Sequence, residues 1–241
     1  MKVVFVTGGS RGIGRGIAER LIAEGYFVAV GYLKNKNLCQ ELISLGGNVL
    51  PVQIDLECSK SINNSVSFIE DKLGPIDILI NNAGIAQERP FMDITDLDWE
   101  RMLKINLWSN FALAKRVIPN MQKVGWGRLV QVSSIGGQWG GLNQVHYAAA
   151  KAGQINLTRS LAKIYSAEGI TSNAVAIGLA KTDMSADEVL RTDGKEKIAS
   201  IPMKRLATVE EIGETVLFLC SGASSYVTGQ TINLNGGMYF V

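Results

Sequence analysis

Short apolar runs recur seven times along the 241-residue chain, and longer amphipathic stretches separate them. The runs are nearly continuous in Val, Ile and Leu and predict strands at 2–7, 27–31, 49–54, 76–80, 127–133, 171–176 and 230–234. The intervening segments predict helices at 13–24, 36–45, 60–73, 96–122, 147–167, 184–199 and 208–220. Strands buried on both faces occur in parallel sheets that helices cover from both sides. The alternation therefore predicts a doubly wound α/β (Rossmann) fold with a seven-stranded parallel sheet.

The pattern predicts one domain over residues 1–241, because no internal repeat or Pro/Ser-rich linker divides it. Residues 179–204 show mixed charge and little alternation, and an excursion of this kind after a strand commonly lies over the ligand crevice. The first apolar run is too short for a signal peptide or a membrane span, so we expect a cytoplasmic protein.

The composition argues against several classes of function. A net charge of +2 without a Lys/Arg run does not suit a nucleic-acid or membrane-surface protein. Three scattered cysteines without a CxxC spacing predict neither a disulfide framework nor a zinc site. The single histidine, His146, argues against a His-rich metal site and a Ser–His–Asp hydrolase, so we expect no metal.

A glycine-rich turn links the first predicted strand to the first predicted helix. Glycine permits a tight turn and close approach to a pyrophosphate, and a helix N-terminus favours an anion. The spacing of its glycines differs from the usual G-x-G-x-x-G fingerprint. We predict that this turn binds a dinucleotide through Gly8, Gly9, Ser10, Arg11, Gly12, Ile13 and Gly14.

The end of the second predicted strand bears on which dinucleotide is bound. An NAD site carries an acid about 20 residues beyond the glycine loop to hold the ribose 2′-hydroxyl. Here Tyr32-Leu33-Lys34 contains no acid, and Lys34 and Arg11 can both face that ribose. Two cations suit a 2′-phosphate, so we expect NADP(H). The alternative is that Lys34 is an ordinary solvated lysine.

Tyr147 and Lys151 open the predicted helix 147–167 and share one face of it. A free tyrosine has a pKa of about 10, and a nearby ammonium lowers it by stabilising the phenolate. Such a tyrosine can give a proton to a carbonyl oxygen as hydride arrives, or take one from an alcohol. The spacing alone also occurs in surface helices.

Further polar residues accompany this pair. Ser134 follows the strand before the helix, where its hydroxyl could polarise the same carbonyl oxygen. Asn81-Asn82-Ala83-Gly84 follows the fourth strand, at the edge where open α/β sheets bind ligands. Asn106 stands inside the helical stretch 96–122, although asparagine weakens helices. A turn and a helix irregularity could explain the two asparagine sites separately, but the combination predicts a reaction site.

Together these motifs resemble the short-chain dehydrogenase/reductase family over almost the whole chain. The resemblance implies that Tyr147 is the general acid/base and that Lys151 holds the nicotinamide ribose and lowers the tyrosine pKa. It also implies that Ser134 orients the substrate oxygen and that Asn106 supports a water linking Lys151 to solvent. The cofactor contacts it implies are Asp55 and Leu56 at the adenine, Thr182 at the carboxamide, and Asn82, Ala83 and Gly84 along the cofactor.

Within the family the likeness is greatest to 3-oxoacyl-[acyl-carrier-protein] reductases and acetoacetyl-CoA reductases, notably in residues 147–153 and 235–239. Residues 125–128 and 201–206 look more like the acetoacetyl-CoA branch. The implied reaction is NADPH-dependent reduction of a 3-oxoacyl thioester to the 3-hydroxyacyl thioester, as in fatty acid biosynthesis. The family also implies a homotetramer packed through the helices after strands four and five.

The chain departs from the family pattern at three places. Ile177-Gly178 replaces the usual Pro-Gly, which frees a backbone angle near the nicotinamide. Gly125 and Glu168 stand where two arginines usually face an acidic acyl carrier protein, and an acid there repels such a partner. His146 precedes Tyr147, where it could touch a substrate or simply pack.

Two other functions stay open. The chain could reduce or oxidise another small carbonyl or alcohol (a sugar, polyol, steroid or ketone), because residues 179–204 carry no readable specificity pattern. It could also be a regulatory protein that binds a dinucleotide without catalysis, although the set of Asn106, Ser134, Tyr147 and Lys151 argues against that.

Overall fold

A computed structural model describes residues 1–44, 46, 48–182 and 192–241. It contains one seven-stranded sheet in the order β3-β2-β1-β4-β5-β6-β7, and every neighbouring pair is parallel. The strands are β1 (Val3–Val6), β2 (Phe27–Tyr32), β3 (Val49–Gln53), β4 (Ile78–Asn81), β5 (Gly127–Ser134), β6 (Ile170–Ile177) and β7 (Thr231–Leu234). The predicted doubly wound α/β fold is confirmed, because the apolar runs form strands at the predicted places.

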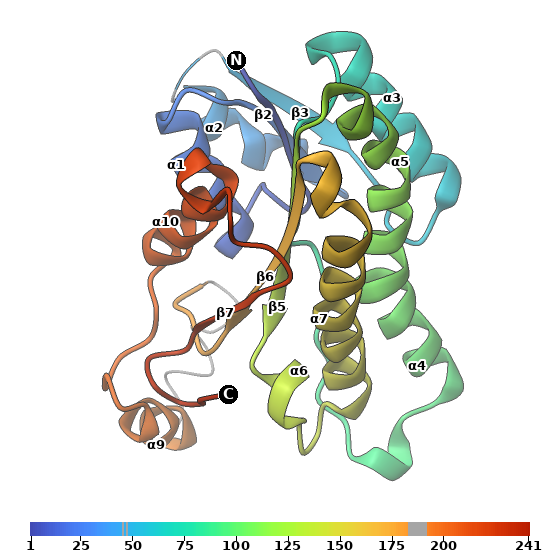
Figure 1. The fold of residues 1–241 in the computed structure, drawn as a ribbon. Helices are drawn as coiled ribbons and strands as arrows, with labels where there is room; N and C mark the ends of the chain where they lie inside the picture. The colour runs from blue at the N-terminus through green and yellow to red at the C-terminus, as the bar shows by residue number, and fades with distance from the viewer. Residues whose placement is uncertain (45, 47, 183–191) are drawn as a thin grey trace.

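Helices cover both faces of this sheet (Figure 1). On one face lie α1 (Gly12–Ala23), α2 (Gln40–Ser44) and α10 (Val209–Cys220), and on the other α3 (Ser59–Leu73), α5 (Ser109–Val124) and α7 (Val145–Tyr165). Alternate residues of each strand supply the two cores, as Val4 and Val6 face α1 whereas Val3 and Phe5 face α3 and α5. Among the described helices, none has both the length and the apolar character needed to cross a membrane.

The predicted helix 96–122 is helical throughout but changes its hydrogen-bond pattern along its length. It divides into α4 (Asp96–Leu103), a π-helical segment (Lys104–Trp108) and α5, and Asn106 lies in the π-helical segment. The predicted helical stretch is confirmed, but the π-helical segment within it was not predicted, because a π turn adds a residue without ending the helical pattern. Such turns commonly occur at functional sites. The predicted helix 36–45 is a 3-10 turn (Lys36–Cys39) followed by α2.

Three short elements were not predicted: 3-10 turns at Phe91–Asp93 and Gly222–Ser224, and α6 (Gly136–Trp139). Of the predicted helix 184–199, residues 184–191 lie outside the described residues, and α9 covers Thr192–Ser200. The strand order reverses at β1, which lies between β2 and β4. The loops after β1 and β4 therefore flank the crevice where folds of this kind bind ligands.

Candidate active site

The glycine-rich turn joins β1 to α1 in a compact conformation. Gly8 and Gly12 have φ angles of 61° and 53°, in the left-handed region that favours glycine. A methyl group at Gly14 would lie 2.2 Å from the Gly8 carbonyl oxygen. In this fully described helix, the first turn of α1 has no side-chain cap and no acidic residue. Its amide groups therefore suit an anion, and the turn fits the pyrophosphate of a dinucleotide.

Thr7 and Asn82 hold this turn against the loop that follows β4. The Thr7 hydroxyl accepts hydrogen bonds from the backbone N–H groups of Asn82 and Ala83, both at 3.0 Å. The Asn82 amide donates to the carbonyl oxygens of Thr7 (2.9 Å) and Gly8 (3.3 Å). The structure thus gives Asn82 a role that the sequence did not predict, which is to hold the glycine turn itself.

The outer end of the crevice lies beyond β2 and β3. Arg11 and Lys34 are exposed, and no carboxylate among the described residues pairs with either. Asp55 partly lines a cavity of about 510 Å³, and Leu33 and Lys60 line it as well. The Asp55 carboxylate accepts the N–H of Glu57 at 2.9 Å, while the neighbouring Leu56 is buried. Lys60 was not predicted as a site residue, because its place on this wall depends on how α3 packs.

Ser134, Tyr147 and Lys151 come together at the carboxyl end of β5. Ser134 is the last residue of the strand, and its hydroxyl accepts the N–H of Gly136 at 3.1 Å. This hydroxyl also lies close enough to the Tyr147 phenol to act on its pKa. The Lys151 ammonium donates to the Val132 carbonyl oxygen at 2.8 Å and lies 5.6 Å from the centroid of the Tyr147 ring. The structure therefore places all three predicted side chains in one site.

Burial shifts the pKa values of both Tyr147 and Lys151. It raises the pKa of the Tyr147 phenol, and the interaction with the Ser134 hydroxyl acts in the opposite direction. Burial also lowers the pKa of Lys151 to about 8. The net shift of the tyrosine pKa is upward because desolvation of the phenol is the largest effect, and Lys151 is not among its causes. A lowering of that pKa by Lys151 stays a prediction.

Asn106 holds the loop after β4 in place. Its side chain accepts the Ile85 N–H at 3.1 Å and donates to the Ile85 carbonyl oxygen at 2.9 Å. The main-chain carbonyl oxygen of Asn106 accepts hydrogen bonds from the side chains of Gln154 (2.7 Å) and Asn110 (3.1 Å). Both lone pairs of that oxygen are thus used. A water between Asn106 and Lys151 stays a prediction, and at this oxygen it would have to displace one of these donors.

Two glycines let the elements of the site approach closely. A methyl group at Gly84 would lie 2.3 Å from Asn106 Oδ1 and 3.9 Å from Lys151 Nζ. At Gly137, in α6, it would lie 2.7 Å from the Lys151 carbonyl carbon. Neither contact could be predicted from the sequence, because each joins elements that are distant along the chain.

Comparison with known proteins agrees with this geometry. Residues 8–239 match the family described as enoyl-(acyl carrier protein) reductase. The chain is 41% identical to the 3-oxoacyl-[acyl-carrier-protein] reductase FabG of Aquifex aeolicus, over 99% of this chain and 97% of that protein.

The chain belongs to the short-chain dehydrogenase/reductase family.

Other short-chain dehydrogenase/reductases show the same level of similarity. The FabG protein of Escherichia coli is 40% identical over 100% of this chain and 98% of its own length. The acetoacetyl-CoA reductase of Rhizobium meliloti is 39% identical over 99% of both chains. Members of this family are oxidoreductases that depend on a nicotinamide cofactor, and this chain is one of them.

The structure also places the remaining residues that the family resemblance singled out. Thr182 lies beside the glycine turn, since a methyl group at Gly12 would be 3.8 Å from its Cγ2. Its contact with the carboxamide stays a prediction, and residues 183–191 of the predicted excursion lie outside the described residues. Ile177 continues β6 as its last residue, is buried, and pairs with Leu234.

Gly125 and Glu168 lie at the amino ends of β5 and β6, opposite the end that carries Ser134. The Glu168 carboxylate accepts a hydrogen bond from Gln122 at 2.7 Å. Within this chain, these two positions are therefore remote from the reaction site.

Proposed function

We propose that this chain is an NADPH-dependent reductase of 3-oxoacyl thioesters, which it converts to 3-hydroxyacyl thioesters. The observation that carries the proposal is the grouping of Ser134, Tyr147 and Lys151 at the carboxyl edge of the sheet, with the Lys151 ammonium 5.6 Å from the centroid of the Tyr147 ring. The substrate class follows from full-length relatives named 3-oxoacyl-[acyl-carrier-protein] reductase and acetoacetyl-CoA reductase.

When bound, the nicotinamide supplies a hydride to the carbonyl carbon of the substrate. The Tyr147 phenol donates its proton to the carbonyl oxygen, and the Ser134 hydroxyl holds that oxygen in position. Burial keeps the phenol protonated near neutral pH, which suits an acid in the reducing direction. Lys151 can then return a proton to the tyrosine oxygen, because a pKa of about 8 leaves its ammonium charged but ready to release a proton.

The proposal of NADPH rests on charge. Arg11 and Lys34 are exposed beside the outer end of the crevice, and β2 ends at Tyr32 without an acid to bind a ribose 2′-hydroxyl. A 2′-phosphate can form charge-assisted hydrogen bonds with both cations. We take residues 8–14, 55–56, 82–84 and Thr182 as the remaining cofactor contacts.

The charges of the chain do not select between CoA and acyl carrier protein as the carrier of the acyl group. Gly125 and Glu168 offer no positive charge to an acidic acyl carrier protein, and they lie at the far end of the strands from Ser134. The proposal therefore covers thioesters of CoA as well as those of the carrier protein. We further propose a cytoplasmic homotetramer, and the exposed side chains of Leu97 on α4 and Phe111 on α5 support packing through those helices.

The test is a steady-state assay of NADPH oxidation. Acetoacetyl-CoA and an acetoacetyl acyl carrier protein are compared with a panel of sugars, polyols, steroids and simple ketones. We expect the thioesters to have the highest kcat/KM. A sugar or steroid that exceeds both thioesters would replace this function with the reduction of that carbonyl class.

A further inference from the structure

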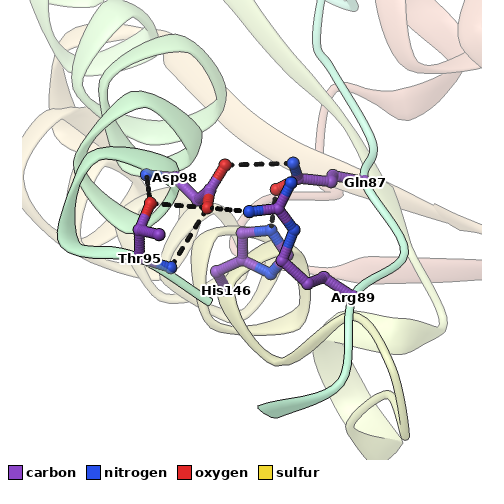
Figure 2. Close-up of polar contacts among 5 residues, drawn as sticks. All are labelled: Gln87, Arg89, Thr95, Asp98 and His146. Atoms are coloured by element: carbon purple, nitrogen blue, oxygen red, sulfur yellow. Dashed lines mark hydrogen bonds and ion pairs between the residues drawn. The ribbon is translucent and has the colours of Figure 1, made fainter. Parts of the chain in front are cut away.

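His146, the residue before Tyr147, joins the start of α7 to the loop that follows β4 (Figure 2). Its imidazole is fully buried, and its Nε2 lies 2.8 Å from Gln87 Oε1. The Gln87 amide in turn donates to Asp98 Oδ1 at 3.0 Å. A side chain with no exposed surface cannot contact a substrate, so His146 has a different role from the substrate contact that the sequence left open.

The direction of these hydrogen bonds follows from Asp98. Hydrogen bonds from Thr95 and Gln87 hold the pKa of this carboxyl at about 2, so it is ionised and can only accept. Gln87 must therefore turn its NH₂ group toward Asp98 and its oxygen toward His146. An amide oxygen only accepts, so His146 Nε2 carries the proton and donates it.

Asp98 is itself held firmly. Its Oδ2 accepts hydrogen bonds from Arg89 (2.6 Å) and from the Thr95 hydroxyl (2.6 Å), and it completes the capping box of α4. The backbone N–H of Arg89 also donates to the Asn143 carbonyl oxygen at 2.7 Å, and Asn143 lies in the segment just before α7. The loop after β4 thus contacts the approach to α7 at two points, Asn143 and His146.

The residues at the start of α7 provide no capping interaction for its first turn. Its N-cap residue, Gln144, makes no side-chain cap, and the first turn has no acidic residue, although this part of the chain is fully described. By contrast, α4 and α10 both begin with complete capping boxes. The hydrogen bond between His146 and Gln87 therefore holds the turn that carries Tyr147, which no side-chain cap stabilises.

We infer that His146 is a positioning residue: its hydrogen bond to Gln87 holds the first turn of α7, and with it Tyr147, against the loop after β4. The inference rests on the proposed function, in which Tyr147 gives the proton. A proton donor must lie within hydrogen-bonding reach of the carbonyl oxygen, and small displacements of such a group lower the rate steeply.

Kinetics of four variants test the inference. We expect His146→Leu and Gln87→Leu each to lower kcat about tenfold, which corresponds to ~1.4 kcal/mol, with KM and the Kd of NADPH nearly unchanged. The double variant should be no slower than either single variant, because both remove one hydrogen bond. His146→Gln, whose amide can still donate to Gln87, should recover most of the rate. Thr158→Val, a matched change lower in α7 where the hydroxyl bonds only its own helix, should keep the wild-type kcat.

Wild-type kcat in His146→Leu, or multiplied losses in the double variant, would overturn the inference. So would a His146→Gln variant as slow as His146→Leu.

The hydrogen bond itself can be observed because His146 is the only histidine of the chain. In an untagged, ¹⁵N-histidine-labelled protein, we expect one imidazole with its proton on Nε2 and slow exchange of that proton with water. Gln87→Leu should accelerate the exchange. A proton on Nδ1, or fast exchange in the wild type, would contradict the proposed link.

A further measurement separates this inference from the proposed function. The ionisation of Tyr147 is obtained as the difference between the alkaline absorbance titrations of the wild type and Tyr147→Phe, each repeated in the His146→Leu background. A changed Tyr147 pKa supports the positioning role even if the wild type fails to reduce acetoacetyl-CoA, a failure that would overturn only the proposed function. An unchanged pKa would overturn the positioning role.

Discussion

The Lys151 ammonium donates a hydrogen bond to the Val132 carbonyl oxygen at 2.8 Å, two residues before Ser134 on β5. The bond joins the helix that carries Tyr147 to the strand that carries Ser134. In return, the Ser133 hydroxyl donates to the Lys151 carbonyl oxygen at 3.1 Å. Strand and helix are thus fixed to each other at the site, and the Ser134–Tyr147 pair inherits its geometry from this contact.

The first prediction concerns the proton donor. Tyr147→Phe removes only the hydroxyl, and we expect kcat to fall by about 10³-fold, within the usual range for the loss of a general acid. NADPH should bind within about twofold of the wild-type Kd, measured by the enhancement of its fluorescence, because the phenyl ring retains the packing. Turnover close to the wild-type value would rule out the mechanism.

The second prediction concerns cofactor choice. The wild type should bind NADPH at least tenfold more tightly than NADH, since Arg11 and Lys34 can pair with the 2′-phosphate. Arg11→Ala and Lys34→Ala should each narrow that ratio by weakening NADPH binding while leaving the Kd of NADH nearly constant. Lys36→Ala, an exposed neighbour on the following 3-10 turn, serves as the control. Equal affinities of the wild type for both cofactors would show that the lack of an acid at the end of β2 does not select NADPH.

Much of this architecture could be predicted from the sequence because it depends on local patterns. Runs such as Val3–Val6 form strands wherever both faces are buried, and the order of strands and helices then determines the sheet. The grouping of Ser134, Tyr147 and Lys151 was predictable for the same reason, since each follows a strand or begins a helix at one edge.

What could not be predicted depends on contacts between distant segments. Gln87 is 59 residues from His146, and nothing in either neighbourhood indicates that the two side chains meet. The direction of the Tyr147 pKa shift was also hidden, because a four-residue spacing shows a neighbouring charge but not the depth of burial. The π-helical segment around Asn106 was signalled only by an asparagine inside a helical pattern.

The third prediction follows from the burial of Lys151. Its pKa is about 8 in the folded protein and 10.5 when solvated, so below pH 8 folding carries the cost of burying a charge. That cost disappears as pH rises from about 8 to 10.5, because the folded state has lost the proton while the unfolded state still holds it. The contribution of Lys151 to the free energy of unfolding should therefore increase over this window, by roughly 3 kcal/mol.

The measurement is the difference in urea unfolding free energy between wild type and Lys151→Met, taken at several pH values from 7 to 10.5. The difference cancels the contributions of other groups whose pKa differs between the folded and unfolded protein, such as Tyr26 and Cys220, whose pKa values burial raises. Lys151→Met should lose the reductase activity. Its unfolding free energy relative to the wild type should be highest at pH 7. A difference that does not change with pH would show that Lys151 is solvated in the folded protein.

The last prediction concerns Gly84, which lies where three parts of the site meet. An added methyl group would be 2.3 Å from Asn106 Oδ1 and 3.9 Å from Lys151 Nζ. Gly84→Ala must therefore displace the Asn106 side chain from its two hydrogen bonds with Ile85, and we expect a loss of ~2 kcal/mol in unfolding free energy. Because the same displacement moves the loop beside Lys151, kcat should fall more than tenfold. Gly222→Ala, where an added methyl group has no described atom within 4 Å, should leave both quantities near wild type. If Gly84→Ala keeps full activity, the contact between Asn106 and the loop after β4 is not needed to hold the site together.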